Sequence, residues 1–295
     1  MNFLFSRTKY IFNHSLFAWL IFIRFSLSSF FQSNKTIHTL LMCHIILPRF
    51  KLYPFFLYIP HQAIHFPWQG PDDPAYRVEG RDYSNDKWGT IEDKNDVSPY
   101  VRSMVEALDR SVGEIVATLK RLDLDRRTLV IFASDNGGYL HYGNSHHNIS
   151  SNGQLRGQKG DLYEGGHRVP AIACWPGRIQ SGTVTNQTTM TMDIFPTLLE
   201  LVDASETGNA EFDGTSILPL LLENKPLPER TLFWRMRQQK AVRRGPWKLY
   251  LNKKKVELYN LDNDIGENND LSKQHVEKVT TMQSELIAWE KEVLG

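Results

Sequence analysis

A run of five apolar residues at positions 129–133 ends abruptly in Ser-Asp-Asn-Gly-Gly at positions 134–138. The run is short and rich in β-branched and aromatic residues, which predicts a buried strand of a parallel sheet followed by a tight loop. In open α/β sheets, ligands gather beyond the carboxyl ends of the strands. Asp135 and Asn136 would therefore offer hard oxygen ligands to a divalent cation such as Ca²⁺ or Mg²⁺. An Asx turn that only caps the strand is the alternative, and for an isolated Asp-Asn-Gly it is the commoner outcome.

The first 53 residues differ in composition from the rest of the chain. None of the 33 acidic residues and none of the 19 glycines lies before residue 70. The only membrane candidate, residues 16–31, is shorter than the roughly 20 apolar residues of a spanning helix and contains Arg24. Because such a composition is unlike that of a globular domain, we first interpret residues 1–53 as non-native coding sequence, such as a read-through intron. A signal peptide or membrane anchor is the second interpretation.

The chain from residue 54 to residue 133 follows the order strand, helix, strand. An apolar run at 55–59 predicts a strand that ends in a proline-stiffened loop, 60–67, with His61 and His65. Histidines at that place are candidates for binding an anion or donating a proton, although surface histidines would be the usual interpretation. Ser98 and Pro99 then predict a helix start, with Ser98 as the cap, and an apolar stripe continues to residue 122. Strand, crossover helix and strand predict a parallel sheet.

Two loops follow the central strand. The first, 139–153, contains three histidines whose spacing matches no familiar zinc site: His141, His146 and His147. We expect them to face solvent, and lining of a pocket is the alternative. The second, 155–170, contains four glycines, so its backbone could approach a ligand closely while Lys159 reaches it as a point charge. A plain surface loop is the alternative. A strand at 169–175 would bury Cys174 as a small apolar residue, and Asp193 precedes a helix.

The last 70 residues change pattern. Four short runs separated by turn residues predict a small antiparallel sheet, and a final helix at about 272–294 carries an apolar face that would pack on it. We therefore divide the chain into an N-terminal segment (1–53), a main α/β domain (54–225) and a small C-terminal α+β subdomain (226–295). The net charge of +1 indicates no nucleic-acid partner.

From about residue 54 onward the chain resembles the sulfatases of the alkaline-phosphatase-like superfamily, especially the arylsulfatases. The resemblance rests on several segments in the family's order: 55–67, 100–122, 132–138, 155–170 with 175–177, 193–199, 257–261 and 267–271. It implies a mixed or parallel α/β sheet flanked by helices, with a small C-terminal antiparallel sheet and helix. It also implies hydrolysis of sulfate esters around one bound Ca²⁺, with a cysteine-derived formylglycine as nucleophile.

The resemblance also implies roles for single residues. Asp135 and Asn136 match metal ligands, and Lys159 matches the lysine that contacts the sulfate and the leaving oxygen. His61 matches the histidine that binds sulfate and serves as acid, with His65 as the fallback. The implied partner is a sulfated small molecule or glycan, and the implied localisation is the secretory route, either lysosomal or extracellular. Two glycosylation sequons within the region of resemblance, at Asn148 and Asn186, are compatible with that route.

The chain also departs from the family pattern. The aspartate pair on the family's first strand is absent, and neither Cys43 nor Cys174 stands in a Cys-x-Pro-Ser-Arg or Cys-x-Ala-Ser-Arg motif. We therefore expect a sulfatase-family chain that is N-terminally incomplete and catalytically incomplete as it stands. The alternatives are a non-catalytic relative that binds a sulfated ligand and a phosphodiesterase of the same superfamily.

Overall fold

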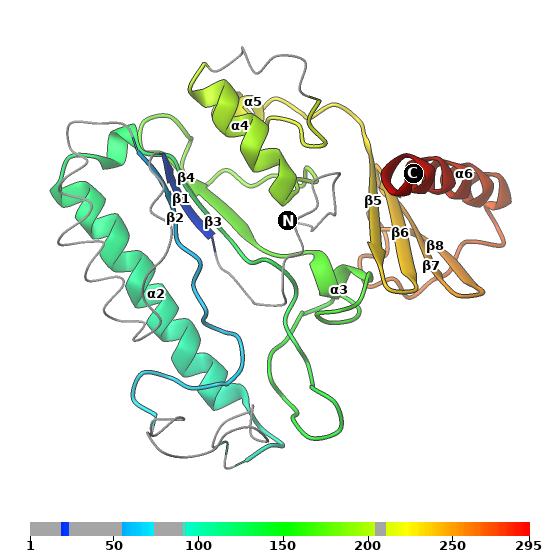
Figure 1. The fold of residues 1–295 in the computed structure, drawn as a ribbon, viewed down its shortest axis with the longest axis horizontal. Helices are drawn as coiled ribbons and strands as arrows, with labels where there is room; N and C mark the ends of the chain where they lie inside the picture. The colour runs from blue at the N-terminus through cyan, green and yellow to red at the C-terminus, as the bar shows by residue number, and fades with distance from the viewer. Residues whose placement is uncertain (1–18, 24–54, 74–90, 92, 204–210) are drawn as a thin grey trace.

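The structure is a computed structural model that describes residues 19–23, 55–73, 91, 93–203 and 211–295. Its described elements form two sheets with helices (Figure 1). Most of the 1–53 segment, including most of the membrane candidate 16–31 and Cys43, lies outside the described residues. Among the residues described, no helix is both long enough and apolar enough to cross a bilayer.

The first sheet contains four strands in the order β2-β1-β3-β4: β1 (Trp19–Ile23), β2 (Phe56–Tyr58), β3 (Val130–Ala133) and β4 (Ala171–Cys174). The predicted strands at 55–59, 129–133 and 169–175 are thus confirmed to within two residues. The predicted parallel pairing of the central strand is wrong, because β3 is antiparallel to both β1 and β4. β2 and β3 still run in the same direction, since each is antiparallel to β1 between them. The sheet is mixed in direction, as the predicted fold class allows.

Helix α2 (Ser98–Arg121) covers one face of this sheet and confirms the predicted crossover helix. Its Ile115 and Leu119 pack with Val130 and Phe132 of β3 in one apolar cluster. The helix is capped differently from the prediction, since Val97 is the N-cap residue and no side chain caps the helix. Ser98 is instead the first helical residue, with Pro99 after it.

Helix α4 (Ile194–Leu201) packs on the other face of β3, where Ala133 contacts Ile194. Alternate residues of β3 therefore face α2 and α4, as expected for a strand buried on both faces. The short helix η4 (Thr191–Asp193) leads into α4, and α5 (Leu218–Glu223) follows it. In Figure 1, α4 and α5 lie together, on the side of the sheet away from α2.

Strand β4 is more exposed than predicted. Cys174 is an exposed free cysteine, and Ile172 is 62% exposed. The prediction of a buried Cys174 is therefore wrong, because β4 is the outermost strand of the described sheet and only β3 pairs with it.

The second sheet is the predicted antiparallel sheet. Its order is β5-β6-β7-β8: β5 (Thr231–Met236), β6 (Gln239–Arg244), β7 (Trp247–Asn252) and β8 (Lys255–Asn260). Helix α6 (Val276–Leu294) packs on one face, where Met282 and Leu286 join Val242, Leu249 and Leu258 in a buried cluster. The predicted packing of the last helix on this sheet is confirmed.

A buried carboxylate connects α4 with the start of the second sheet. Asp193 accepts two hydrogen bonds from Arg230, at 2.6 and 2.5 Å, and one each from the backbone N–H groups of Met190 and Thr215. The guanidinium fork neutralises a carboxylate that is fully buried. The predicted helix-start aspartate therefore also holds the segment before β5 against η4.

Candidate functional site

The carboxyl ends of β2 and β3 lie at one edge of the first sheet and carry His61 and Asp135, respectively. Burial raises the pKa of Tyr58, the last residue of β2, and the charge of Asp135 raises it further. The two strand ends are therefore close enough to interact electrostatically. Burial also lowers the pKa of His61, whose Nε2 is buried and makes no hydrogen bond to the residues that the structure describes.

The turn after β3 presents the side-chain oxygens of Asp135 and Asn136, which are adjacent in sequence, as possible ligands for a cation. The hydroxyl of Ser134 donates a hydrogen bond of 2.9 Å to the carbonyl of Asn136, which closes the turn on itself. Asp135 is buried, with 7% of its surface exposed. Oδ1 of Asn136 is also buried and accepts no hydrogen bond from the described residues. A buried acceptor without a donor is costly, and a bound cation is one way to satisfy it.

Gly137 fixes this turn against the glycine-rich segment that follows. Its backbone N–H donates a 3.0 Å hydrogen bond to the carbonyl of Gly166 in helix α3 (Glu164–His167). A Cβ atom at Gly137 would lie 1.8 Å from the carbonyl oxygen of Gly165. The two backbones approach so closely that only glycine fits at position 137.

Gly137→Ala is expected to lower the free energy of unfolding by about 1–3 kcal/mol, because the added methyl group forces the turn away from α3. Urea denaturation followed by circular dichroism measures the change. Gly113→Ala is the matched control, since a Cβ at Gly113 in α2 meets nothing within 4 Å. Alanine there is expected to be neutral or stabilising by about 0.5–1 kcal/mol. Equal effects of the two substitutions would contradict the close approach of the two backbones.

Lys159 lies beside the same turn. Its backbone N–H donates a 3.2 Å hydrogen bond to the carbonyl of Gly138, and its Nζ lies 5.5 Å from the ring centroid of Tyr139. Burial lowers the pKa of Lys159, and the charge of Asp135 opposes that change. The fold thus brings together Asp135, Asn136 and Lys159 from two predicted loops, with His61 following the end of β2 in the same sheet.

Two amide side chains that no sequence pattern singled out support this arrangement. Asn152 accepts a hydrogen bond from the N–H of Gly138 and donates to the carbonyls of Gly138 and Gly157, each at 3.0 Å. Oε1 of Gln158 accepts hydrogen bonds from the backbone N–H groups of Leu140 and His141. Both residues tie the loop after β3 to the Lys159 loop.

The other histidines are not brought into this arrangement. Nδ1 of His65 hydrogen-bonds the carbonyl of its neighbour Phe66, and the two rings lie 4.1 Å apart at a tilt of 38°. His141 and His147 are exposed, as predicted. His146 is buried, so the prediction that it faces solvent is wrong. Its ring packs against Trp68.

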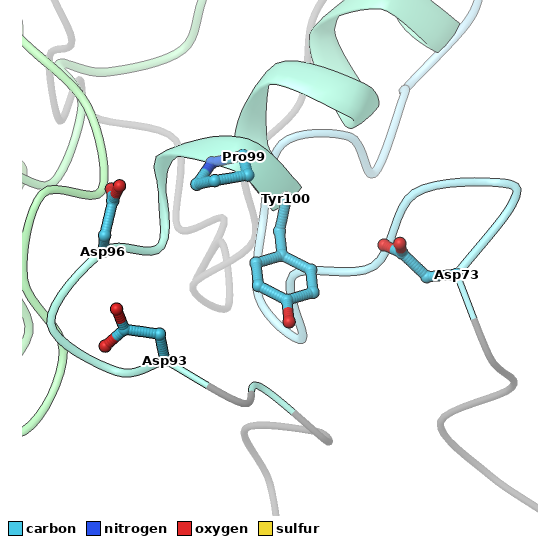
Figure 2. Close-up of a pocket in the computed structure, with 5 residues that line it drawn as sticks. All are labelled: Asp73, Asp93, Asp96, Pro99 and Tyr100. Carbon is cyan, nitrogen blue, oxygen red and sulfur yellow. The ribbon is translucent and has the colours of Figure 1, made fainter.

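A cavity elsewhere contains none of these site residues. It is lined by three carboxylates, Asp73, Asp93 and Asp96, together with Pro99 and Tyr100 at the start of α2. Figure 2 shows the Tyr100 ring between Asp73 on one side and the other two carboxylates on the opposite side. The described residues contain no group of three or more His, Cys, Asp or Glu arranged to hold a metal ion. This cavity is therefore not a candidate metal centre.

The turn after β3 fits one side of a calcium site. Ca²⁺ takes six to eight oxygen ligands, usually with carboxylates and amide carbonyls among them. A buried carboxylate and a buried amide oxygen, adjacent in sequence at Asp135 and Asn136, match that chemistry. The remaining ligands would have to come from other groups, since the described residues contain no set of three or more His, Cys, Asp or Glu arranged to hold a metal ion.

Helix α3 adds a buried histidine beside the site. His167 lies against the ammonium group of Lys248, 3.2 Å from Nε2 to Nζ, and against the ring of Trp234. Burial and the charge of Lys248 lower the pKa of His167 to about 3. The folded protein therefore keeps this imidazole neutral at pH values where an unfolded chain would protonate it.

Stability is consequently expected to fall as the pH falls from about 6.5 toward 4.5, because the unfolded state then binds a proton that the folded state excludes. His167→Gln is expected to reduce the slope of unfolding free energy against pH by up to about 1.4 kcal/mol per pH unit. Urea titrations at intervals across this window measure the slope for both proteins. An unchanged slope would mean that another group titrates there.

Comparison with known proteins places these features in one family. The family model for sulfatases matches residues 48–204, which is more than half of the chain. The chain belongs to the sulfatase family. A second family model, for the C-terminal part of N-sulphoglucosamine sulphohydrolase, matches residues 158–292. The predicted family and its mixed α/β fold are confirmed.

Relatives of the chain include sulfatases from a bacterium and from mammals. The chain is 33% identical over 269 residues to a sulfatase of Formosa agariphila, covering 80% of this chain and 46% of the relative. It is 35% identical over 204 residues to arylsulfatase A of Bos taurus, covering 67% of this chain and 36% of the relative. The chain thus spans less than half the length of these relatives.

Solved structures show the same fold. Ps i-CgsB in complex with k-i-k-neocarrahexaose superimposes with a TM-score of 0.72 at 28% identity, over 88% of this chain and 55% of that one. A protein of a core genetic locus for the metabolism of multiple glycosaminoglycans in Bacteroides thetaiotaomicron gives a TM-score of 0.66 at 26% identity. That match covers 87% of this chain and 54% of the other.

Proposed function

We propose that this chain forms the cation-binding and sulfate-binding part of a sulfatase site, the kind of site that hydrolyses sulfate esters. The observation that carries the proposal is the meeting of Asp135, Asn136 and Lys159 at the strand ends of a sulfatase fold. A lysine whose pKa is lowered by burial, beside a buried carboxylate, suits a site for an anion and a cation together.

Each residue has a proposed role. Asp135 and Asn136 would hold one divalent cation, Ca²⁺, through their side-chain oxygens. When bound, the cation supplies positive charge beside the sulfate oxygens. Lys159 would donate a charge-assisted hydrogen bond to a sulfate oxygen or to the leaving oxygen. His61 would bind sulfate and donate the proton that the leaving alcohol needs.

The nucleophile is not among these residues. Neither cysteine of the chain stands in the family's formylglycine motif, and Cys174 is exposed on β4. We therefore propose that the chain alone binds sulfate without hydrolysing its esters. Incubation with 4-methylumbelliferyl sulfate, after expression with and without the formylglycine-generating enzyme, tests this. Turnover in either preparation would contradict the proposal, and failure to bind sulfate would contradict the anion site.

The proposed ligand class is a sulfated sugar, and the proposed compartment is the secretory route. One structural relative contains a carrageenan-type oligosaccharide, and a relative from Mus musculus is an N-acetylgalactosamine-6-sulfatase, 35% identical over 147 residues. Asn148 and Asn186 are both exposed, as N-glycosylation would require. We also propose that the chain divides into two domains near residue 225, between its two sheets.

A non-catalytic relative that only binds a sulfated ligand would likewise give no turnover of 4-methylumbelliferyl sulfate.

The cation site makes a separate prediction. Asp135→Asn is expected to weaken binding of Ca²⁺, or of Tb³⁺ as its luminescent substitute, by at least about tenfold, because one anionic ligand becomes neutral. Terbium luminescence titration of the purified chain measures the affinity. Glu106→Gln, which removes one exposed carboxylate from α2, is the control. Equal losses in both variants would show that the cation binds by surface charge alone.

A further inference from the structure

Glu164, at the start of α3, is the centre of a buried ionic cluster outside the proposed anion site. Its side chain is fully buried, and its Oε1 accepts a 2.8 Å hydrogen bond from Nζ of Lys248, which is also fully buried. Arg168 and Arg243 each approach its Oε2 at 3.4 Å. Burial raises the pKa of Glu164, but the positive charges of Lys248 and Arg243 lower it more, so the carboxylate stays ionised.

Glu267 joins the same cluster from the segment after β8. Its Oε1 lies 2.9 Å from Nζ of Lys248, and its Oε2 accepts a 2.6 Å hydrogen bond from the backbone N–H of Glu164. Three residues far apart in sequence are therefore fixed to one another within the buried interior. Two of them, Lys248 and Glu267, belong to the C-terminal part of the chain.

Helix α3 transmits this attachment to both loops of the anion site. The N–H of Gly165 donates a 2.6 Å hydrogen bond to the carbonyl of Arg156, and the carbonyl of Gly166 accepts the one from Gly137. A Cβ on Gly165 would lie 2.4 Å from the carbonyl oxygen of Gly157. Gly137 directly follows Asn136, and Arg156 and Gly157 lead into Lys159.

The Lys159 loop has further anchors in the second sheet. Nη1 of Arg156 donates to the carbonyl of Glu267 at 2.7 Å and to the hydroxyl of Tyr259 at 3.0 Å. Gln239 accepts from the N–H of Leu162 and donates to the carbonyl of Gly160, each at 3.0 Å. The loop is thus held on both sides of Lys159 by groups of the C-terminal part.

A contribution to the stability of the fold does not explain why this buried cluster is ionic. Desolvating three charges costs about as much as their pairing returns, and an apolar cluster of the same volume would often be as stable. What directional ion pairs add is a unique position for the groups they hold. Here the groups held are the glycines of α3 that contact both site loops.

We propose that Lys248 and Glu267 are positioning residues, which set the place of Lys159 and of the Asn136 turn by locking Glu164. The proposal rests on the proposed function only in naming Lys159 as the sulfate ligand. It predicts that loosening the lock frees the two loops while the rest of the fold stays intact.

Glu267→Gln is the principal test variant, because glutamine keeps the shape and the acceptor for the N–H of Glu164 but removes the charge that Lys248 binds. Lys248→Met is the second variant, and Glu267→Gln suffices if Lys248→Met fails to fold. Lys240→Met is the matched control, since Lys240 of β6 forms an ion pair with Glu290 of α6 and contacts neither loop.

Two rates are measured on the full chain without substrate. Amide hydrogen exchange in peptides covering 135–140 and 155–168 is expected to quicken at least tenfold more than exchange in α2 and α6 in the test variants. Acetylation of Lys159 relative to the other lysines is expected to rise several-fold. A uniform increase in exchange across the protein would reduce the cluster to a general stabiliser and overturn the proposal, as would unchanged rates. If these rates change while Lys159 proves not to bind sulfate, the proposed function fails and the positioning role stands.

Discussion

Replacing Lys248 by methionine is expected to lower the free energy of unfolding by about 3–5 kcal/mol, because removing one partner of a buried ion pair leaves charge uncompensated. Lys248 is fully buried, and it pairs with Glu164 at 2.8 Å and with Glu267 at 2.9 Å. Methionine fills a similar volume, so the loss reports the missing charge more than a cavity. The two carboxylates would then share an apolar interior without their ammonium partner.

Urea denaturation, followed by circular dichroism and by tryptophan fluorescence, measures this loss. Lys240→Met removes a lysine from the same sheet whose partner, Glu290, lies 2.6 Å away, but that lysine is 33% exposed. Its loss is expected to cost less than about 1 kcal/mol, because solvent screens a partly exposed pair. Similar losses in both variants would mean that the buried ion pairs of Lys248 contribute no more to the free energy of unfolding than a partly exposed ion pair does.

Lys159→Met is expected to raise the dissociation constant for inorganic sulfate by about 10- to 150-fold. This corresponds to about 1.5–3 kcal/mol, the contribution of a hydrogen bond to a charged group. Burial of Lys159 and its lowered pKa indicate a site of reduced water access, where such a bond is stronger than at the surface. Isothermal titration calorimetry at fixed ionic strength, with Ca²⁺ present, measures the constant.

Lys253→Met provides the control for net charge. Lys253 lies in the turn between β7 and β8 and is exposed. Its replacement therefore removes one positive charge from a residue outside the proposed sulfate site. The control is expected to change sulfate affinity by less than about twofold, since exposed charges are screened by salt. An equal weakening by both substitutions would reassign sulfate binding to the overall field of the protein.

The strands, helices and most candidate residues could be predicted from sequence because their signals are local. The run at 129–133 carries its apolar character within a single strand, and the stripe of α2 repeats within the helix. The four C-terminal strands are separated by short turns, so each pairs with its neighbour in sequence. The chemistry of Asp135, Asn136 and Lys159 could likewise be predicted from residue type and local position. Asp135 and Asn136 follow a strand, and Lys159 lies between glycines.

Pairing and burial could not be predicted in the same way, because they depend on contacts between distant segments. The parallel pairing of β3 was wrong, since β1 lies between β2 and β3 and runs opposite to both. Cys174 was expected inside and His146 outside, and each is the reverse. An apolar strand is buried only if another element covers it, and a polar ring is buried when an aromatic partner such as Trp68 receives it.

By itself, the sequence determined the local elements, the family and the residue types for one cation and one anion. Only the tertiary structure decided that Asp135 and Lys159 interact, and that Glu164 meets Lys248 and Glu267 across 84 and 103 residues of chain. The physical reason is range. Periodicity and turn chemistry act over a few residues, whereas a buried charge finds its partner only when distant segments, here α3 and β7, pack together.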